Sequence, residues 1–445
     1  MKTEVLWRLK GESRTNSAAH GIHRPSVHCT ICLGLACLSM SGFAPAQSQE
    51  VAHIHYRVHD LGVVGTNPSQ PGQPFVISNN GWVPGAVGVG AAEHAVLWHG
   101  NEMFDIGDPG LGGNSMAFGV DDSGHAVGEA EDTSTGRSTT EDFCGVQAMG
   151  YSFSPTPCVP FIWRQGRMVP LKTLGGVNGA ANQVNNFGLI AGFAETATAD
   201  PGCSAPQIYQ FKPAVWFGNS VQALPTGTDP DGVALSINDL GQVVGTSGTC
   251  APFNAIWLFN LNPVHALLWQ GGIPVDLGNL GGGFNNMAHD INNLGAVVGG
   301  SDVAGDETSH AFLWTPAQKM QDLGTVNDAV GDDFFSVGLG INDKGQIVGT
   351  SASADFSILR AFIRENGKLV DLNSLVSADT TLDLLTACSI NLNGEIIGIG
   401  FDPNTGDIHA YRATPTNEGG SWADARRPVI LPDWLRARLR FVRPV

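Results

Sequence analysis

Short apolar runs separated by glycine-rich polar turns recur along most of the chain. The segment "INDKGQIVG" at 341–349 shows the pattern, with one apolar run before a polar turn that ends in Gly345 and another after it. Runs this short, rich in Val and Ile and bounded by Asn, Asp and Gly, are typical of β-strands joined by tight hairpins. The segment therefore predicts two antiparallel strands and the turn between them.

The same nine-residue motif occurs seven times, at a spacing of about 50 residues, which is typical of propeller blades, arrays or solenoids. Its fifth place is always Gly. The copies are 77–85, 120–128, 184–192, 237–245, 291–299, 341–349 and 390–398.

Two more apolar runs follow each motif. In one unit they are the pentad "HAFLW" at 310–314 and, after a polar turn, "MQDLG" at 320–324. Each unit thus has four short strands, which we call a, b, c and d. The last pentad, 409–413, lacks its follower, but "VHDLG" at 58–62 stands before the first motif.

This displacement predicts an all-β, seven-bladed β-propeller of four-stranded blades. The N-terminal strand 56–62 would complete the last blade and close the ring. Closure inside one blade removes an exposed sheet edge, whereas an open solenoid would need capping units.

The paired motifs resemble the HAF-repeat family of bacterial extracellular proteins, which is named for the "HAFLW" element. The resemblance covers about 56–413. It implies secretion and a β-propeller-like fold, and it implies no established activity. Blades 2 and 3 depart from the pattern, because their pentads lack His and their d strands lack Asp-Leu-Gly.

The chain ends differ from the repeats. An apolar run at 31–44 follows Arg14 and Arg24 and precedes Ala46, which predicts a secretory signal cleaved after Ala46. No later segment is long and apolar enough to span a membrane, so we expect a secreted protein, extracellular or periplasmic. The predicted parts are a signal peptide (1–46), the seven-repeat propeller (47–416) and a basic C-terminal tail (417–445), disordered or a short helix.

The net charge limits the partners. There are 23 basic and 41 acidic side chains, a net of −18, which repels nucleic acid. We therefore expect an extracellular glycan or a protein as partner, no nucleic acid, and a monomeric chain.

The polar residues of the motif suit a structural role. Asn or Asp early in a turn can bond its own backbone, and Gly at the end adopts a positive φ. A calcium loop needs more oxygen ligands than this motif offers. The hairpin residues assigned in this way are Asn238, Asp239, Gly241, Asn292, Gly295, Asn342, Asp343 and Gly345.

His94, His265, His310 and His409 open strand c in four blades. Histidines in separate blades cannot share one metal ion, so we assign them to hydrogen bonds that brace each blade. The Trp residues that close the same strand are assigned to packing between blades.

The cysteines of the repeat region are expected in the loops between strands b and c. An exported protein permits disulfides, and we predict Cys144–Cys158 and Cys203–Cys250, although four cysteines allow three pairings. Cys388, in a strand a, is expected to be a buried free thiol.

Function is expected on the face that carries the long b–c loops, since loops on a rigid scaffold usually hold the site. A propeller glycosidase would place carboxylates at the axis, and only Asp290, beside His289, is charged or titratable on the a strands.

We therefore predict a binding or structural module, ligand unknown, with no catalytic, cofactor or metal residues. The alternative is a secreted polysaccharide hydrolase or lyase with its site on the long-loop face. A calcium ion in one of the acidic loops is the alternative for a cofactor.

Overall fold

The computed structural model describes residues 54–63, 76–89, 92–100, 102–107, 111, 113–139, 156–203, 207–254, 259–328, 331–416 and 430–433. The predicted signal peptide, Cys144 and nearly all of the C-terminal tail lie outside these residues. Within the described part, no helix has the length and apolar character needed to cross a membrane.

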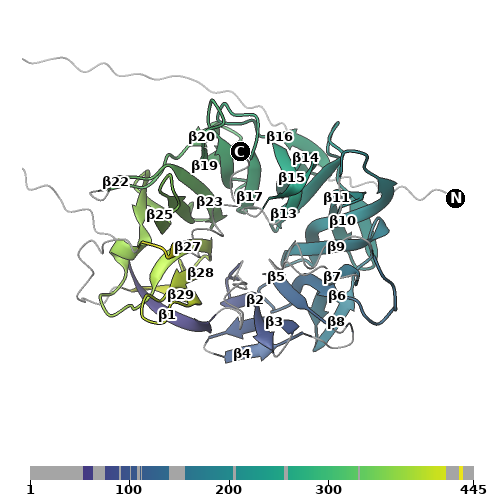
Figure 1. The fold of residues 1–445 in the computed structure, drawn as a ribbon, viewed down its shortest axis with the longest axis horizontal. Helices are drawn as coiled ribbons and strands as arrows, with labels where there is room; N and C mark the ends of the chain where they lie inside the picture. The colour runs from purple at the N-terminus through teal and green to yellow at the C-terminus, as the bar shows by residue number, and fades with distance from the viewer. Residues whose placement is uncertain are drawn as a thin grey trace, which may run out of the picture. The chain divides into compact units, whose positions relative to one another are not determined.

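Seven antiparallel sheets follow one another around a ring (Figure 1), and each corresponds to one repeat. This confirms the predicted seven-bladed propeller. Blades 1 to 3 are β2 (Trp82–Val89), β3 (Ala92–His99), β4 (Glu102–Asp105); β5 (Ser115–Val120), β6 (Ala126–Glu131), β7 (Cys158–Arg164), β8 (Arg167–Pro170); and β9 (Gly175–Val184), β10 (Leu189–Ala199), β11 (Tyr209–Phe217), β12 (Ser220–Ala223).

The second half of the ring continues the pattern. Blades 4 and 5 are β13 (Asp231–Ile237), β14 (Val243–Asn254), β15 (Phe259–Gln270), β16 (Ile273–Asp276); and β17 (Met287–Ile291), β18 (Val297–Asp302), β19 (Ser309–Thr315), β20 (Lys319–Asp322). Blades 6 and 7 are β23 (Phe335–Ile341), β24 (Ile347–Ala352), β25 (Leu359–Glu365), β26 (Lys368–Asp371); and β27 (Asp383–Ile390), β28 (Ile396–Phe401), β29 (Ile408–Thr416), β1 (His55–Val63). Between blades lie the short strands β21 (Asn327–Asp328) and β22 (Gly331–Asp332) and the 3-10 helix η1 (Leu372–Leu375).

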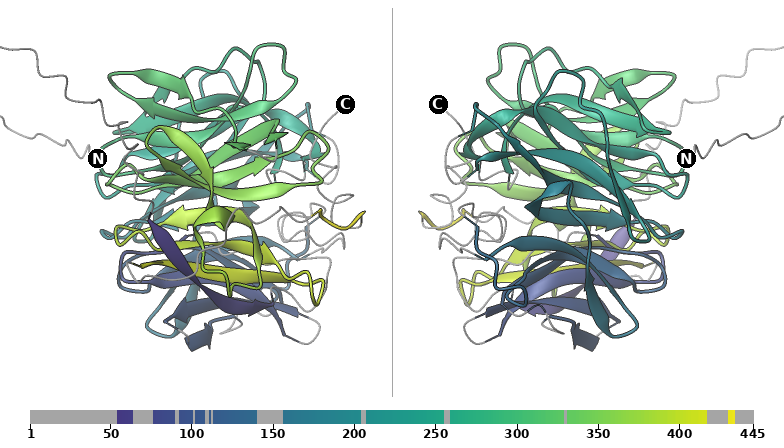
Figure 2. Two further views of the ribbon diagram at one scale, coloured as in Figure 1. Left: turned by 90° about the vertical axis from the view of Figure 1, so that its left-hand side faces the viewer. Right: turned by 90° about the vertical axis from the view of Figure 1, so that its right-hand side faces the viewer.

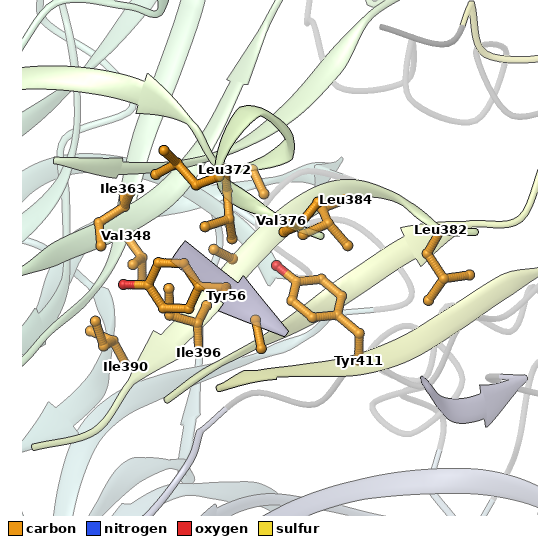
Figure 3. Close-up of a cluster of buried hydrophobic side chains, with 14 residues drawn as sticks. Tyr56, Val348, Ile363, Leu372, Val376, Leu382, Leu384, Ile390, Ile396 and Tyr411 are labelled. Atoms are coloured by element: carbon orange, nitrogen blue, oxygen red, sulfur yellow. The ribbon is translucent and has the colours of Figure 1, made fainter. Parts of the chain in front are cut away.

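The two ends of the repeat region meet in blade 7. Strand β1 pairs antiparallel with β29, from His55 opposite Thr416 to Val63 opposite His409. Tyr56 is fully buried there among Leu372, Val376 and Tyr411 (Figure 3). The Ser377 amide also donates to the Tyr56 carbonyl at 3.2 Å, which ties β1 to the segment that follows blade 6. The predicted closure is therefore confirmed.

Blade 1 differs from the other six because the described residues give it three strands. Its a–b turn is present, since the Ser78 amide bonds to the Trp82 carbonyl. The amide of the preceding residue, Ile77, donates to Ser389 Oγ of blade 7 at 3.4 Å.

Tryptophans at the end of strand c lie between neighbouring blades. Trp216 and Trp269 are buried, and their indole N–H groups donate at 2.7 Å to the carbonyls of Lys172 and Pro225, which follow the preceding blade. Each indole therefore has its apolar body in the interface and its one donor satisfied.

Because successive strands of a blade run in opposite directions, their connections lie on two opposite faces of the ring. The a–b and c–d turns form what we call the hairpin face, and the b–c loops and d–a crossovers form the long-loop face. The connection 246–264 between strands b and c of blade 4 is largely an extension of the β14–β15 pair. Leu431 is buried on the long-loop face against Leu385 and Phe401, and segment 430–433 is the short yellow piece in Figure 2.

The predicted Cys203–Cys250 pairing and the buried Cys388 thiol are confirmed, but Cys158 and Cys250 lie in strands β7 and β14 and not in b–c loops as predicted. Cys203 and Cys250 form a disulfide that joins blades 3 and 4. Cys158 is also disulfide-bonded, and Cys388 is a buried free thiol whose pKa is raised by burial to about 11. A disulfide is consistent with an oxidising, extracytoplasmic location.

We expect Tyr56→Ala to lower the free energy of unfolding by roughly 3–5 kcal/mol, the usual cost of deleting a buried aromatic ring. Urea denaturation would measure it. The matched control is Tyr56→Phe, because the Tyr56 hydroxyl is buried and bonds to no described residue. We expect that control to be neutral or stabilising, and an equal loss in both variants would contradict the assignment to ring packing.

Candidate functional site in the axial pocket

A cavity of about 330 Å³ lies on the propeller axis at its hairpin face. It is lined by the a strands and by the a–b turns that follow them. We call it the axial pocket. Residues from all seven blades reach it, so its shape depends on how neighbouring hairpins are joined.

The second residue of the motif, which is Asn in five of the seven blades, makes one such joint. Asn342 Oδ1 accepts from the amides of Lys344 and Gln346 in its own turn, and its Nδ2 donates to the Asn391 carbonyl of the next blade at 2.8 Å. The turn-capping half was predicted from the sequence, and the bond to the next blade was not. The same pair of functions recurs at Asn185, Asn238, Asn292 and Asn391.

The third residue of each motif forms a belt around the pocket, which we call the third-place belt. Around the ring its members are Asn79, Asp122, Asn186, Asp239, Asn293, Asp343 and Leu392. Amide and carboxylate side chains thus alternate until the last place.

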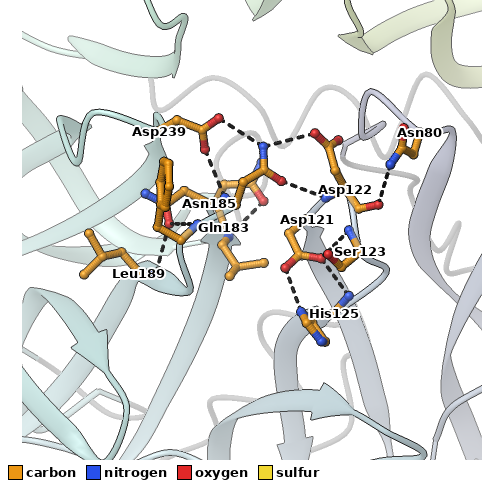
Figure 4. A network of polar contacts seen from close by, with 12 residues as sticks. Asn80, Asp121, Asp122, Ser123, His125, Gln183, Asn185, Leu189 and Asp239 are labelled. Carbon is orange, nitrogen blue, oxygen red and sulfur yellow. Dashed lines mark hydrogen bonds and ion pairs between the residues drawn. The ribbon is translucent and has the colours of Figure 1, made fainter.

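Hydrogen bonds run through this belt from blade to blade. The Asn186 amide donates to Asp239 Oδ1 at 3.0 Å, and the Asp239 amide donates to Asn293 Oδ1 at 2.9 Å. Asn186 Nδ2 also reaches a carboxylate on each side, Asp122 and Asp239, both at 3.0 Å (Figure 4). Because an amide donor stands between the acids, neighbouring turns avoid direct contact of like charges.

Amide and carboxylate side chains cannot alternate all the way around a ring of seven places. The place that breaks the alternation is Leu392. The Leu392 side chain has no hydrogen-bond acceptor. The backbone amide of Asp343, which would donate to an acceptor at that place, makes no hydrogen bond to any described residue. The Leu392 amide still donates to Asn79 Oδ1 at 3.0 Å. The belt therefore has six of its seven backbone bonds.

The wall of the pocket departs most from an apolar lining in blades 3 and 5. The positions three and two residues before the second-place residue are both polar there: Asn182 and Gln183, and His289 and Asp290. Blades 4 and 7 have one polar residue of the two, Ser236 beside Leu235 and Ser389 beside Cys388, whereas Phe118 and Leu339 line the wall in blades 2 and 6. The polar groups of the wall are therefore concentrated in blades 3 to 5, with Ser389 of blade 7 besides.

Asp290 acts mainly as a brace between blades. Its carboxylate accepts from Ser236 Oγ of blade 4 at 2.7 Å and from the Ile341 amide of blade 6 at 2.9 Å, besides the Ile291 amide. Burial raises its pKa to about 6, against the effect of these bonds. Burial lowers the pKa of the neighbouring His289 to about 4, so its imidazole is neutral at pH 7.

Asn182 and Gln183 keep polar groups for other partners. A register shift between β9 and β10 turns both side chains toward the axis. Gln183 Oε1 accepts from the Val184 amide, and Asn182 Nδ2 donates to the Ala234 carbonyl. Gln183 Nε2 and Asn182 Oδ1 bond to no described residue. The close approach requires Gly119, where a Cβ would lie 2.6 Å from the Gln183 Cα.

Asp290 is the acid on the a strands that lines the pocket, as predicted. Further acids reach the same pocket from the a–b turns, namely Asp121, Asp122, Asp239 and Asp343. The pocket also lies on the hairpin face, opposite the face where function was expected. Residue spacing along one strand does not reveal either point, because turns of seven separate blades converge here.

The repeated histidines bond to aspartates of the same blade in three cases. His310 Nδ1 lies 3.0 Å from the Asp322 carboxylate, whose other bond is to the Gly324 amide. His94 with Asp105 and His409 with Asp60 are arranged alike. His265 instead contacts Asp229, at 2.8 Å.

Potential metal ligands gather at one place in the part of the chain that the structure describes, at Cys203, Asp231 and Cys250. Both sulfurs there are joined in the disulfide, so they are not thiolate ligands in this form. The predicted absence of a metal centre and the calcium alternative both stay predictions.

Two solved structures are distantly similar to this chain. Dipeptidyl peptidase 4 of Porphyromonas gingivalis matches with a TM-score of 0.34 and 10% identity, over 74% of this chain and 50% of that one. Trypanosoma rangeli sialidase matches with a TM-score of 0.33 and 8% identity, over 77% and 54%. The chain thus spans about half the length of these proteins. No protein-family model and no curated protein sequence matches it.

We expect Asp290→Asn to flatten part of the dependence of stability on pH. A folded-state pKa raised above the ordinary 3.8 means that folding takes up a proton between about pH 4 and pH 6. The stability of the wild type relative to the variant should therefore fall by roughly 2 kcal/mol as pH rises through this window. Urea titrations at several pH values would measure the difference, and a difference that rises with pH would contradict it.

The third-place belt predicts opposite effects for two substitutions. Asn186→Asp puts a carboxylate between Asp122 and Asp239 and removes their shared donor, so we expect a loss of roughly 1–2 kcal/mol. Leu392→Asn supplies the acceptor that the Asp343 amide lacks, so we expect a gain of about 1 kcal/mol. Chemical denaturation of both variants would test this, and two changes of the same sign would refute the alternating belt.

Proposed function

We propose that the protein is a secreted HAF-repeat β-propeller that acts as a binding module, with the axial pocket as its binding site. The observation that supports this is the polar wall of blades 3 to 5. The ring needs the residues that recur in every blade, whereas the polar side chains at Asn182 and Gln183 do not recur. Their free Nε2 and Oδ1 groups are available to a ligand.

The chemistry of the pocket favours a small neutral ligand with hydroxyl groups. Gln183 Nε2 offers a donor and Asn182 Oδ1 an acceptor, and Phe118 and Leu339 offer apolar surface on the other side. Binding sites for small molecules typically combine an apolar lining with a few polar groups in a volume of about 300–1,000 Å³. A sugar residue of an extracellular glycan has these properties.

The acids of the pocket are poorly placed for hydrolysis. A glycosidase uses one carboxyl group as acid and another as base or nucleophile, and each must reach the substrate. Asp290 accepts three bonds from the protein, and Asp122, Asp239 and Asp343 accept bonds within the belt. Asp121 accepts from the Ser123 and His125 amides of its own turn. This supports binding rather than turnover at the axis. A hydrolase or lyase site on the long-loop face is the competing hypothesis.

We expect Gln183→Ala and Asn182→Ala each to weaken binding of an oligosaccharide at least tenfold, because each removes a hydrogen bond inside the pocket. A panel of extracellular oligosaccharides, screened by calorimetry with the mature protein, would provide the probe. Asn404→Ala, on the exposed long-loop face, is the matched control. Reproducible cleavage of a panel member, or an equal loss in the control, would overturn the proposal.

A further inference from the structure

Three neighbouring hairpin tips carry large apolar side chains in solvent. At the fourth place of the motif, Phe187, Leu240 and Leu294 are 71%, 70% and 73% exposed. They belong to blades 3, 4 and 5. The same place in the other four blades is polar, with Asn80, Ser123, Lys344 and Asn393. A turn does not require an apolar residue at this place, so the three departures need another explanation.

The c–d turns enlarge this surface. Phe217 of blade 3 and Ile273 of blade 4 are 66% and 68% exposed and lie on the same face. The belt bonds from Asn186 to Asp239 and from Asp239 to Asn293 hold the three tips beside one another. We call Phe187, Phe217, Leu240, Ile273 and Leu294 the apolar patch. Grouped, exposed apolar side chains of this size mark a contact surface.

The electrostatics beside the patch favour a basic partner. The axial pocket next to it is lined by five aspartates, Asp121, Asp122, Asp239, Asp290 and Asp343, and by no Lys or Arg among the described residues. The whole chain carries a net charge of −18. A segment that alternates apolar and basic side chains would therefore complement both the patch and the pocket mouth.

The chain contains one segment with this composition. Residues 434–445, "WLRARLRFVRPV", hold four Arg and no acid, interleaved with Trp, Leu, Phe and Val. Just before it, Leu431 is fixed on the long-loop face, where its amide donates to the Ser357 carbonyl at 2.9 Å. The segment therefore starts from the face opposite the patch. Twelve residues reach about 40 Å at most when fully extended. To reach the apolar patch of the same molecule, they would have to pass around the ring.

We propose that residues 434–445 of one molecule dock on the apolar patch of a second copy. The contact joins two different surfaces, so it forms chains or closed rings of molecules rather than a two-fold dimer. It goes beyond the proposed ligand binding, because the patch lies outside the pocket, and it departs from the monomer expected from the sequence.

The test uses the full mature chain and a labelled synthetic peptide of residues 430–445. We expect the chain to show concentration-dependent association in analytical ultracentrifugation and the peptide to bind it. Leu240→Asp with Leu294→Asp should weaken peptide binding at least tenfold and abolish association. Ser123→Asp with Lys344→Asp, at the same turn place in blades 2 and 6, is the matched control and should change peptide binding less than threefold.

A second pair of variants tests the other side of the contact. Leu439→Asp with Phe441→Asp in the full chain should abolish association while the oligosaccharide binding of the axial pocket persists. A monomer at every concentration, together with a peptide that fails to bind or binds the Leu240→Asp, Leu294→Asp variant equally well, would overturn the proposal. Because the pocket ligand is measured separately, that outcome would leave the proposed function unaffected.

Discussion

Hydrogen bonds between neighbouring a–b turns hold the seven blades in one ring. A four-stranded sheet of this size cannot bury both of its faces alone, so each blade depends on the next. The second-place asparagine serves both needs, since one side of its amide caps its own turn and the other bonds to the following blade. Each such bond contributes only about 1 kcal/mol net, but the bonds recur around the axis. They also keep buried amides satisfied where water has little access.

An odd number of blades limits how regular this ring can be. Alternating Asn and Asp side chains satisfy donors and separate charges, and seven places leave one that cannot follow the rule. The exception, Leu392, falls in blade 7, the blade in which β1 and β29 close the ring without a covalent link. The closure is reinforced by the burial of Tyr56 of β1, and the bond from Asn391 Nδ2 to the Ser78 carbonyl joins blade 7 to blade 1. The irregular place and the chain closure thus occupy the same part of the ring.

The repeat made the fold predictable from the sequence, but it did not indicate the candidate site in the axial pocket. Seven copies of the hairpin motif establish the blade number and the displaced strand even where one copy is degenerate, as in blade 1. Asn182 and Gln183 occur in one blade and the exposed tips Phe187, Leu240 and Leu294 in three, so a search for recurrence in all seven treats them as variation. The alternation of Asn and Asp was visible in the sequence. Its meaning was not, because a turn considered alone gives no sign of the turn beside it in space. Loop length, which can be read from the sequence, predicted a site on the long-loop face instead.

The residues that depart from the repeat lie in the same three neighbouring blades. They are thus distinct from the residues that recur in every blade and build the ring. Blades 3 to 5 supply the polar wall of the axial pocket, and the same blades supply the exposed apolar tips at its mouth. On the opposite face, the Cys203–Cys250 disulfide joins blades 3 and 4. A covalent link limits the separation of two blades that otherwise share only non-covalent contacts. It therefore helps to fix the spacing between Gln183 and Ser236, whose side chains stand on adjacent strands of the pocket wall. Residues common to all blades build the ring, and the departures in three adjacent blades give one side of it a distinct chemistry.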